Sequence, residues 1–155
     1  MTGTVGLHLL LAAVSAFCFG ILYQESRATA LAAAALAGAG WAASALLSAV
    51  PHLAVLPVFL GSLVVGGGAE MLAVIRREPV TLLVVPAIIP FVPGYEAYQS
   101  MVAFIQNEFV SGLERGLGAL LTASAIAVGL AVSSSLMRPL MRQMPGFRAR
   151  RPGRE

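Results

Sequence analysis

Residues 80–104 read VTLLVVPAIIPFVPGYEAYQSMVAF, an apolar run long enough to cross a lipid bilayer, with Glu96 as its one charged residue. Three prolines and a glycine interrupt it: Pro86, Pro90, Pro93 and Gly94. A proline inside a helix donates no backbone hydrogen bond and clashes with the carbonyl four residues earlier. The spacing therefore predicts a membrane-spanning segment that is broken near its middle.

The whole chain shares the apolar character of this run. Of its 155 residues, 58% are hydrophobic and 11% are charged, whereas an ordinary globular domain carries about 25% charged residues. Every base is an arginine and every acid a glutamate, and the formal net charge is +3. This composition excludes a soluble domain and indicates an integral membrane protein.

Four further apolar runs flank the interrupted segment, so we expect an all-α, polytopic membrane bundle of about five transmembrane helices. The expected spans are 5–23, 29–49, 53–75, 80–104 and 116–137, the fourth being the proline-interrupted one. The Pro51-His52 pair divides the second span from the third. We expect residues 1–137 to form one transmembrane domain and residues 138–155 to form a basic cytoplasmic tail.

The arginines predict the orientation, because loops on the cytoplasmic side are enriched in basic residues. With five spans and the N-terminus outside, every arginine except Arg115 lies on the inner side. Residues 1–24 carry no charge, so they lack the basic region of a signal peptide, and we expect the first span to be retained. A re-entrant fourth segment is the alternative, which the arginine distribution also tolerates.

The broken segment predicts a small-molecule site. Unpaired backbone groups are not tolerated facing lipid, so the break must face protein or a cavity. Loosened carbonyls, here those of Leu82, Pro86 and Ile89, accept from an ammonium group, and a half-helix N-terminus suits a carboxylate. The expected substrate-binding residues are Pro86, Pro90, Pro93, Gly94, Glu96 and Tyr98. The alternative is a kinked helix repaired by its neighbours, with no ligand.

Two carboxylates fall within the expected spans. Glu96 lies next to the break, where it binds a substrate ammonium or a proton, or else caps the second half-helix. Glu70 lies near the cytoplasmic end of its span, where we expect it to extend to the interface.

Other classes of site find little support. The single cysteine, Cys18, excludes an internal disulfide, and the two histidines, His8 and His52, are too far apart to suggest a metal site. We expect no catalytic residues, no metal and no cofactor, so the chain is not expected to be an enzyme. No nucleic-acid motif is present, and membrane lipid explains the basic tail more simply than nucleic acid does.

Small residues recur at helical spacing in the second and fifth spans. They are Ala30, Ala34, Gly38 and Ala42, and Ala119, Ala123, Ala127, Ala131 and Ser135. Such stripes permit close helix packing, either inside the bundle or at a subunit interface with another chain or a second copy. Gly66-Gly67-Gly68 permits close approach or bending in the third span.

The pattern Ile89-Pro90, Pro93-Gly94 and Tyr98, with Ala97 and Met101, resembles the small membrane subunit of the threonine/serine exporter (ThrE-type) family. A second patch, TASAIAVGLAVS from Thr122, resembles the last span of that family, and the likeness covers the whole length. Glu96 lies outside the shared pattern.

The resemblance implies a bacterial inner-membrane subunit of a two-part exporter. Its partner would be a larger subunit with a cytoplasmic domain and its own membrane half, and its substrate a small amino acid such as threonine or serine. Two alternatives stay open: a subunit of a dicarboxylate (succinate-like) exporter, and a membrane assembly subunit that does not transport.

Overall fold

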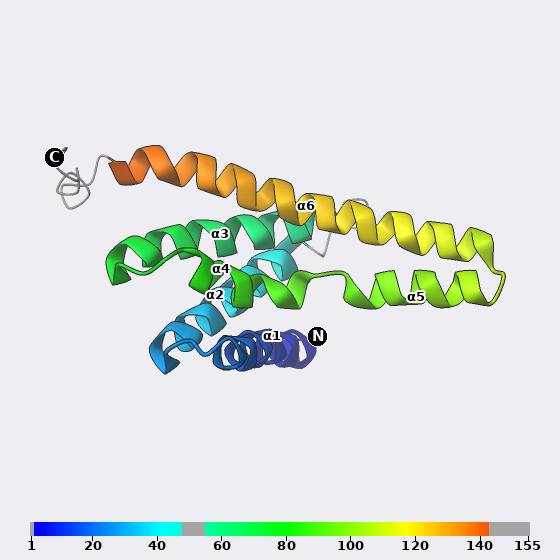
Figure 1. The fold of residues 1–155 in the computed structure, drawn as a ribbon, viewed down its shortest axis with the longest axis horizontal. Helices are drawn as coiled ribbons and strands as arrows, with labels where there is room; N and C mark the ends of the chain where they lie inside the picture. The colour runs from blue at the N-terminus through cyan, green and yellow to red at the C-terminus, as the bar shows by residue number, and fades with distance from the viewer. Residues whose placement is uncertain (1, 48–54, 143–155) are drawn as a thin grey trace, which may run out of the picture.

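The computed structural model describes residues 2–47 and 55–142, and this part of the chain consists of helices joined by short turns, without a strand. The elements are α1 (Thr2–Leu22), α2 (Arg27–Leu47), α3 (Leu56–Arg76), α4 (Thr81–Ile88), the 3-10 helix η1 (Ile89–Phe91), α5 (Gly94–Ile105) and α6 (Phe109–Arg142) (Figure 1). The predicted all-α membrane bundle is confirmed. The expected Pro51-His52 turn and tail residues 143–155 lie outside the described residues.

Long apolar helices make this a multi-pass membrane protein. Among the described residues, α2, α3 and the Phe109–Met137 part of α6 are each long and apolar enough to cross a membrane. The α4–η1 segment and α5 together make a fourth candidate, and α1 contributes a shorter apolar helix, Gly6–Leu22. Five crossings therefore stay a prediction, which requires both α1 and the bent pair to cross.

Helix α3 contacts its neighbours through glycines. A Cβ at Gly61 would lie 2.6 Å from the ring of Phe91, and one at Gly66 would lie 2.7 Å from the hydroxyl of Ser133 on α6. A Cβ at Gly68 would collide with Leu36 on α2. The close approach expected at Gly66 and Gly68 is confirmed, and α3 is unbroken there.

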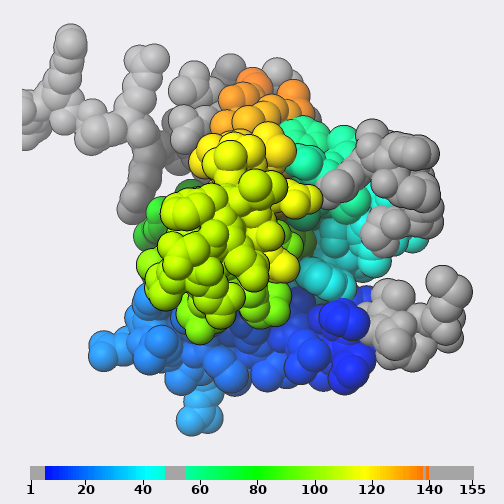
Figure 2. Space-filling model, turned by 90° about the vertical axis from the view of Figure 1, so that its right-hand side faces the viewer, coloured from blue at the N-terminus to red at the C-terminus, as the bar shows by residue number. Residues whose placement is uncertain are grey.

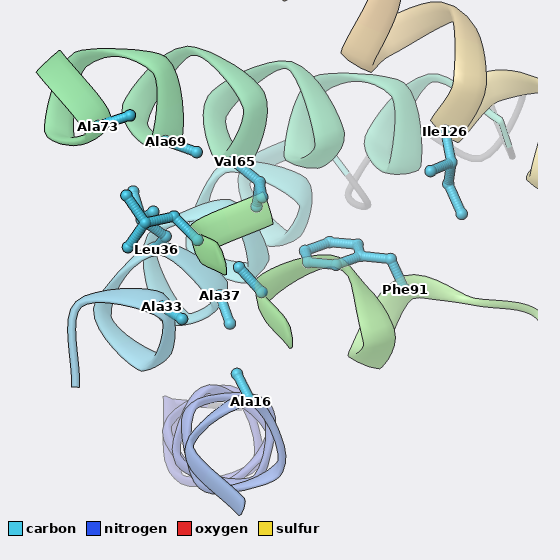
Figure 3. Packing of buried hydrophobic residues seen from close by; sticks show 11 residues of the cluster. Ala16, Ala33, Leu36, Ala37, Val65, Ala69, Ala73, Phe91 and Ile126 are labelled. Atoms are coloured by element: carbon cyan, nitrogen blue, oxygen red, sulfur yellow. The ribbon is translucent and has the colours of Figure 1, made fainter. Parts of the chain in front are cut away.

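The small-residue stripe on α2 serves internal packing. Ala30, Ala34 and Gly38 are buried, and a Cβ at Gly38 would meet Leu9 of α1 at 3.6 Å. Figure 3 shows the alanine-rich core, in which Ala33, Ala37 and Val65 have no exposed surface. Small side chains let these helices approach closely, which is how helices associate in lipid.

On α6 the predicted stripe divides. Ala119 is buried, whereas the side chains of Ala123, Ala127, Ala131 and Ser135 are exposed. The residues of α6 that contact α3 lie on another face, where Gly129 meets Ser62. None of the helices that the structure describes covers the outer part of this stripe.

The helix directions fix the path of the broken segment. Gly129 of α6 lies against Ser62 of α3, and Ser133 lies against Gly66, so these two helices run the same way. The α4–α5 segment therefore returns the chain along the bundle (Figure 1). Helix α5 and the first half of α6 form an antiparallel hairpin that extends past the other helices, and Figure 2 views it end-on.

Candidate functional site

The predicted break is present, and it lies at residues 89–93. Helix α4 continues through Pro86 to Ile88, the chain tightens into η1, and Val92 is extended with φ −63° and ψ 128°. Helix α5 then begins at Gly94, and the two halves meet at 49°. The prolines that interrupt the helix are therefore Pro90 and Pro93, whereas Pro86 is accommodated inside α4.

Three carbonyls at the break already have hydrogen-bond partners. The Val92 amide donates to the Ile89 carbonyl at 3.1 Å, and the Gly94 amide donates to the Val92 carbonyl at 2.8 Å. The Pro93 carbonyl accepts from the Ala97 amide at 3.1 Å. The expectation that the break leaves the Ile89 carbonyl free for an ammonium group is wrong, because the tighter 3-10 turn supplies a donor three residues later.

Phe91 anchors the break to the bundle. Its ring lies in a notch between Gly40 of α2 and Gly61 of α3, where a Cβ at Gly40 would lie 3.1 Å from the ring. Trp41 contacts Phe91 with ring centroids 5.9 Å apart, and His8 of α1 stacks on Trp41 at 6.0 Å with an interplanar angle of 14°. An aromatic row thus runs from α1 through α2 to the break.

A cavity of about 720 Å³ lies beside this aromatic row. It is lined by His8, Trp41, Ser44, Ala45, Val58, Pro90, Phe91, Pro93, Tyr95, Glu96 and Thr122. Helices α1, α2, α3 and α6 thus all contribute, together with the break and the start of α5. The volume falls within the range of small-molecule sites, about 300–1,000 Å³.

Apolar walls and a few polar groups make up the lining. The hydroxyl of Ser44 donates to the Trp41 carbonyl at 2.8 Å, and that of Thr122 donates to the Gly118 carbonyl at 3.0 Å. Each hydroxyl oxygen can still accept a hydrogen bond. The Glu96 carboxylate lies close to α6, since a Cβ at Gly118 would be 3.5 Å from Oε2. A carboxylate and a tryptophan ring in the wall of one cavity suit a cationic amine.

The comparison with protein families identifies the chain. A family model described as "Threonine/Serine exporter, ThrE" matches residues 8–136. The chain belongs to the threonine/serine exporter family. The match includes every residue that lines the cavity, and it confirms the resemblance seen in the Ile-Pro and Pro-Gly pairs. The comparisons found no matching curated protein and no matching solved structure.

Family membership makes this chain a membrane transporter of the threonine/serine exporter type. The exporter's predicted site residues fall into two groups. Pro90, Pro93 and Glu96 line the cavity together. Pro86 is buried in the bundle core, and Gly94 and Tyr98 are exposed and do not line the cavity. A binding role for any of the six stays a prediction.

The backbone at Gly94 does not require a glycine, although its place after Pro93 suggests that it would. None of the described glycines has a positive φ, and a Cβ at Gly94 would have nothing within 4 Å. Gly94 is simply the first residue of α5.

Sequence reasoning named three of the eleven residues that line the exporter's cavity and missed the other eight. Trp41, the only tryptophan, sits in a helix otherwise built of small residues, and this contrast is a signal that could have found it. The Thr122 hydroxyl donates to the Gly118 carbonyl of its own helix, and the same residue also lines the cavity. His8 was considered only as a metal ligand, and nothing local to α1 indicates its stacking on Trp41.

Proposed function

We propose that this chain is the small membrane subunit of a two-part exporter that moves threonine- or serine-like amino acids out of a bacterial cell, across the inner membrane. The cavity beside the break is its solute site. The observation that carries the proposal is the grouping of Glu96, Trp41 and two hydroxyl side chains around one cavity in a member of this family.

The lining is chemically matched to a hydroxylated amino acid. The substrate ammonium pairs with the Glu96 carboxylate and lies near the face of Trp41. The N-terminus of α5 is at the cavity wall, where its positive dipole end favours the substrate carboxylate. Ser44 and Thr122 then accept from the substrate hydroxyl, which gives a reason for selecting serine or threonine over alanine.

The same lining disfavours a dicarboxylate. A dicarboxylate needs fixed positive charges, yet the described lining contains one carboxylate and no arginine. Placing the two carboxylates of such a substrate next to Glu96 would cost free energy by like-charge repulsion. An assembly subunit without transport would have no use for a cavity of this composition.

A partner fits the surfaces that this chain leaves uncovered. The exposed small residues Ala123, Ala127 and Ala131 on α6 offer a close-packing face for the larger subunit, or for a second copy. Ala123→Leu is expected to weaken copurification with the larger subunit by adding bulk to this face. Gly38 packs against α1, so a substitution there would not test the contact with the partner.

The solute site is tested by threonine efflux from cells that express both subunits. Glu96→Gln keeps the size of the side chain and removes its charge, so efflux should fall roughly tenfold or more, the usual scale for losing a charged hydrogen bond. Glu114→Gln is the matched control, since Glu114 is an exposed carboxylate on α6 that does not line the cavity. Normal efflux from a well-expressed Glu96→Gln chain would contradict the assignment.

A further inference from the structure

Two turns meet at the end of the bundle opposite the cavity. They are residues 23–26, between α1 and α2, and residues 77–80, between α3 and α4. Across them the hydroxyl of Thr29 donates to Oε2 of Glu78 at 3.0 Å, although the two residues are 49 positions apart. Thr29 is 2% exposed, so this hydrogen bond is shielded from competing water on the threonine side.

Both partners are held in place by their own turns. Ser26 caps α2 by accepting from the Thr29 amide at 3.1 Å, and its hydroxyl lies 2.7 Å from that of Thr29. Glu78 follows Arg77, whose φ of 58° ends α3, and the Glu78 amide donates to the Ala73 carbonyl at 3.1 Å. The guanidinium of Arg76 lies 4.0 Å from the same Oε2 atom.

The helices that carry these residues also lead to the cavity. Helix α2 runs from Thr29 to Trp41 and Ser44, and α4 runs from the second turn to the break at Pro90. Between the two ends, fully buried side chains close the space, among them Ala33, Ala37, Leu83 and Ala87. The two helices are thus tied together at one end, and the cavity lies at the other end, where α2 and the break after α4 line it.

We propose that the Thr29–Glu78 hydrogen bond is a latch that closes this end of the exporter while the cavity is open at the other, a proposal that rests on the cavity being the solute site. A transporter needs one end closed while the other is open, and releasing the latch lets α2 and α4 part at the turns. The break at 89–93 supplies the hinge, because α4 can move there without disrupting the hydrogen bonds of α5.

Thiol labelling tests the latch directly in the full-length chain, expressed with its larger partner. The native thiol is removed by Cys18→Ala, and Ala33→Cys places a reporter one helical turn beyond Thr29, at a position with no exposed surface. A charged, membrane-impermeant maleimide is added to vesicles of either orientation. We expect slow labelling in this background, and labelling about tenfold faster after Thr29→Val or Glu78→Gln, from the side of the turns only.

Matched variants separate the latch from general loosening. Thr81→Val makes the same change at an exposed threonine, the first residue of α4, which lies outside the Thr29–Glu78 hydrogen bond. This variant should leave the labelling rate unchanged. Thr29→Ser keeps the donor and should stay slow. The latch is overturned if Thr29→Val and Glu78→Gln label at the background rate at equal membrane abundance, or if Thr81→Val accelerates labelling equally.

This result is independent of the solute assignment, because labelling requires no transported solute. Normal efflux by Glu96→Gln would contradict the assignment of the solute site, whereas an unchanged labelling rate in Thr29→Val would contradict the latch.

Discussion

A Cβ on Gly61 would lie 2.6 Å from Cε1 of Phe91, so this glycine makes room for the aromatic ring at the helix break. The contact holds residues 89–91 against α3 and presents Phe91 to Trp41, 5.9 Å away. Phe91 belongs both to the buried core, as Figure 3 shows, and to the wall of the cavity.

Gly61→Ala should therefore displace Phe91 and lower both stability and efflux. Inserting a methyl group into a packed core typically costs about 1–3 kcal/mol. Thermal unfolding of the purified chain in detergent and threonine efflux measure the two effects. Gly94→Ala is the control, because a Cβ there meets nothing within 4 Å. If Gly61→Ala is as stable as the parent, the notch around Phe91 is not tightly packed.

The three prolines should respond differently to replacement by alanine. Pro90→Ala and Pro93→Ala allow the helix to continue across the break, which would straighten the 49° bend and move Glu96 away from the cavity. Membrane abundance should be equal to or above that of the parent, because proline costs about 3 kcal/mol inside a helix, while efflux should fall. Pro86→Ala, within the continuous α4, is the matched control and should retain efflux. Full transport by the Pro90 and Pro93 variants would mean that the break has no part in solute binding.

Glu25 gives a prediction about pH. It lies in the α1–α2 turn, outside the membrane-spanning helices, where burial and then repulsion from Glu78 raise the pKa of its carboxyl above the ordinary value. A raised pKa means that the folded state favours the protonated acid, so its contribution to stability is fully present below the unfolded-state pKa and is lost as pH rises through the folded-state pKa.

Glu25→Gln should therefore raise the melting temperature at neutral pH and flatten its dependence on pH in the acidic range. Glu108→Gln is the control, because Glu108 occupies the equivalent position after a residue of positive φ, Asn107, in the α5–α6 turn. Melting curves in detergent at a series of pH values measure the effect. If the melting temperatures of the parent and of Glu25→Gln change with pH by the same amount, the Glu25 carboxyl does not contribute to the pH dependence of stability.

Reporter fusions test the number of crossings. Fusions after Glu25, His52, Glu78, Glu108 and Arg142 should alternate, beginning on the cytoplasmic side, if α1 and the bent α4–α5 pair both cross. The parallel course of α3 and α6 favours this outcome, because the chain must return along the bundle between them. Fusions after Glu78 and Glu108 that report the same side would make the α4–α5 pair re-entrant.

The sequence alone determined that the chain folds in a lipid bilayer, that it is all-helical, and where the fourth apolar segment breaks. These follow from local properties: long uncharged runs require helices in lipid, and closely spaced prolines interrupt the hydrogen bonds of the helix that contains them. The family was also readable locally, because its Pro-Gly pattern occupies consecutive residues. Pro90, Pro93 and Glu96 could be named for the same reason.

Only the tertiary structure decided which side chains share the cavity and which stripe packs inside. His8 and Thr122 are 114 positions apart in the chain, and they line one cavity because Gly40 and Gly61 let Phe91 pack between α2 and α3. Pro86 and Tyr98 belong to the same run as Pro90, yet one is in the core and the other is exposed. Hydropathy and proline spacing act within a single helix, whereas a cavity depends on how closely several helices can approach, and that distance is set by pairs of residues far apart in the chain.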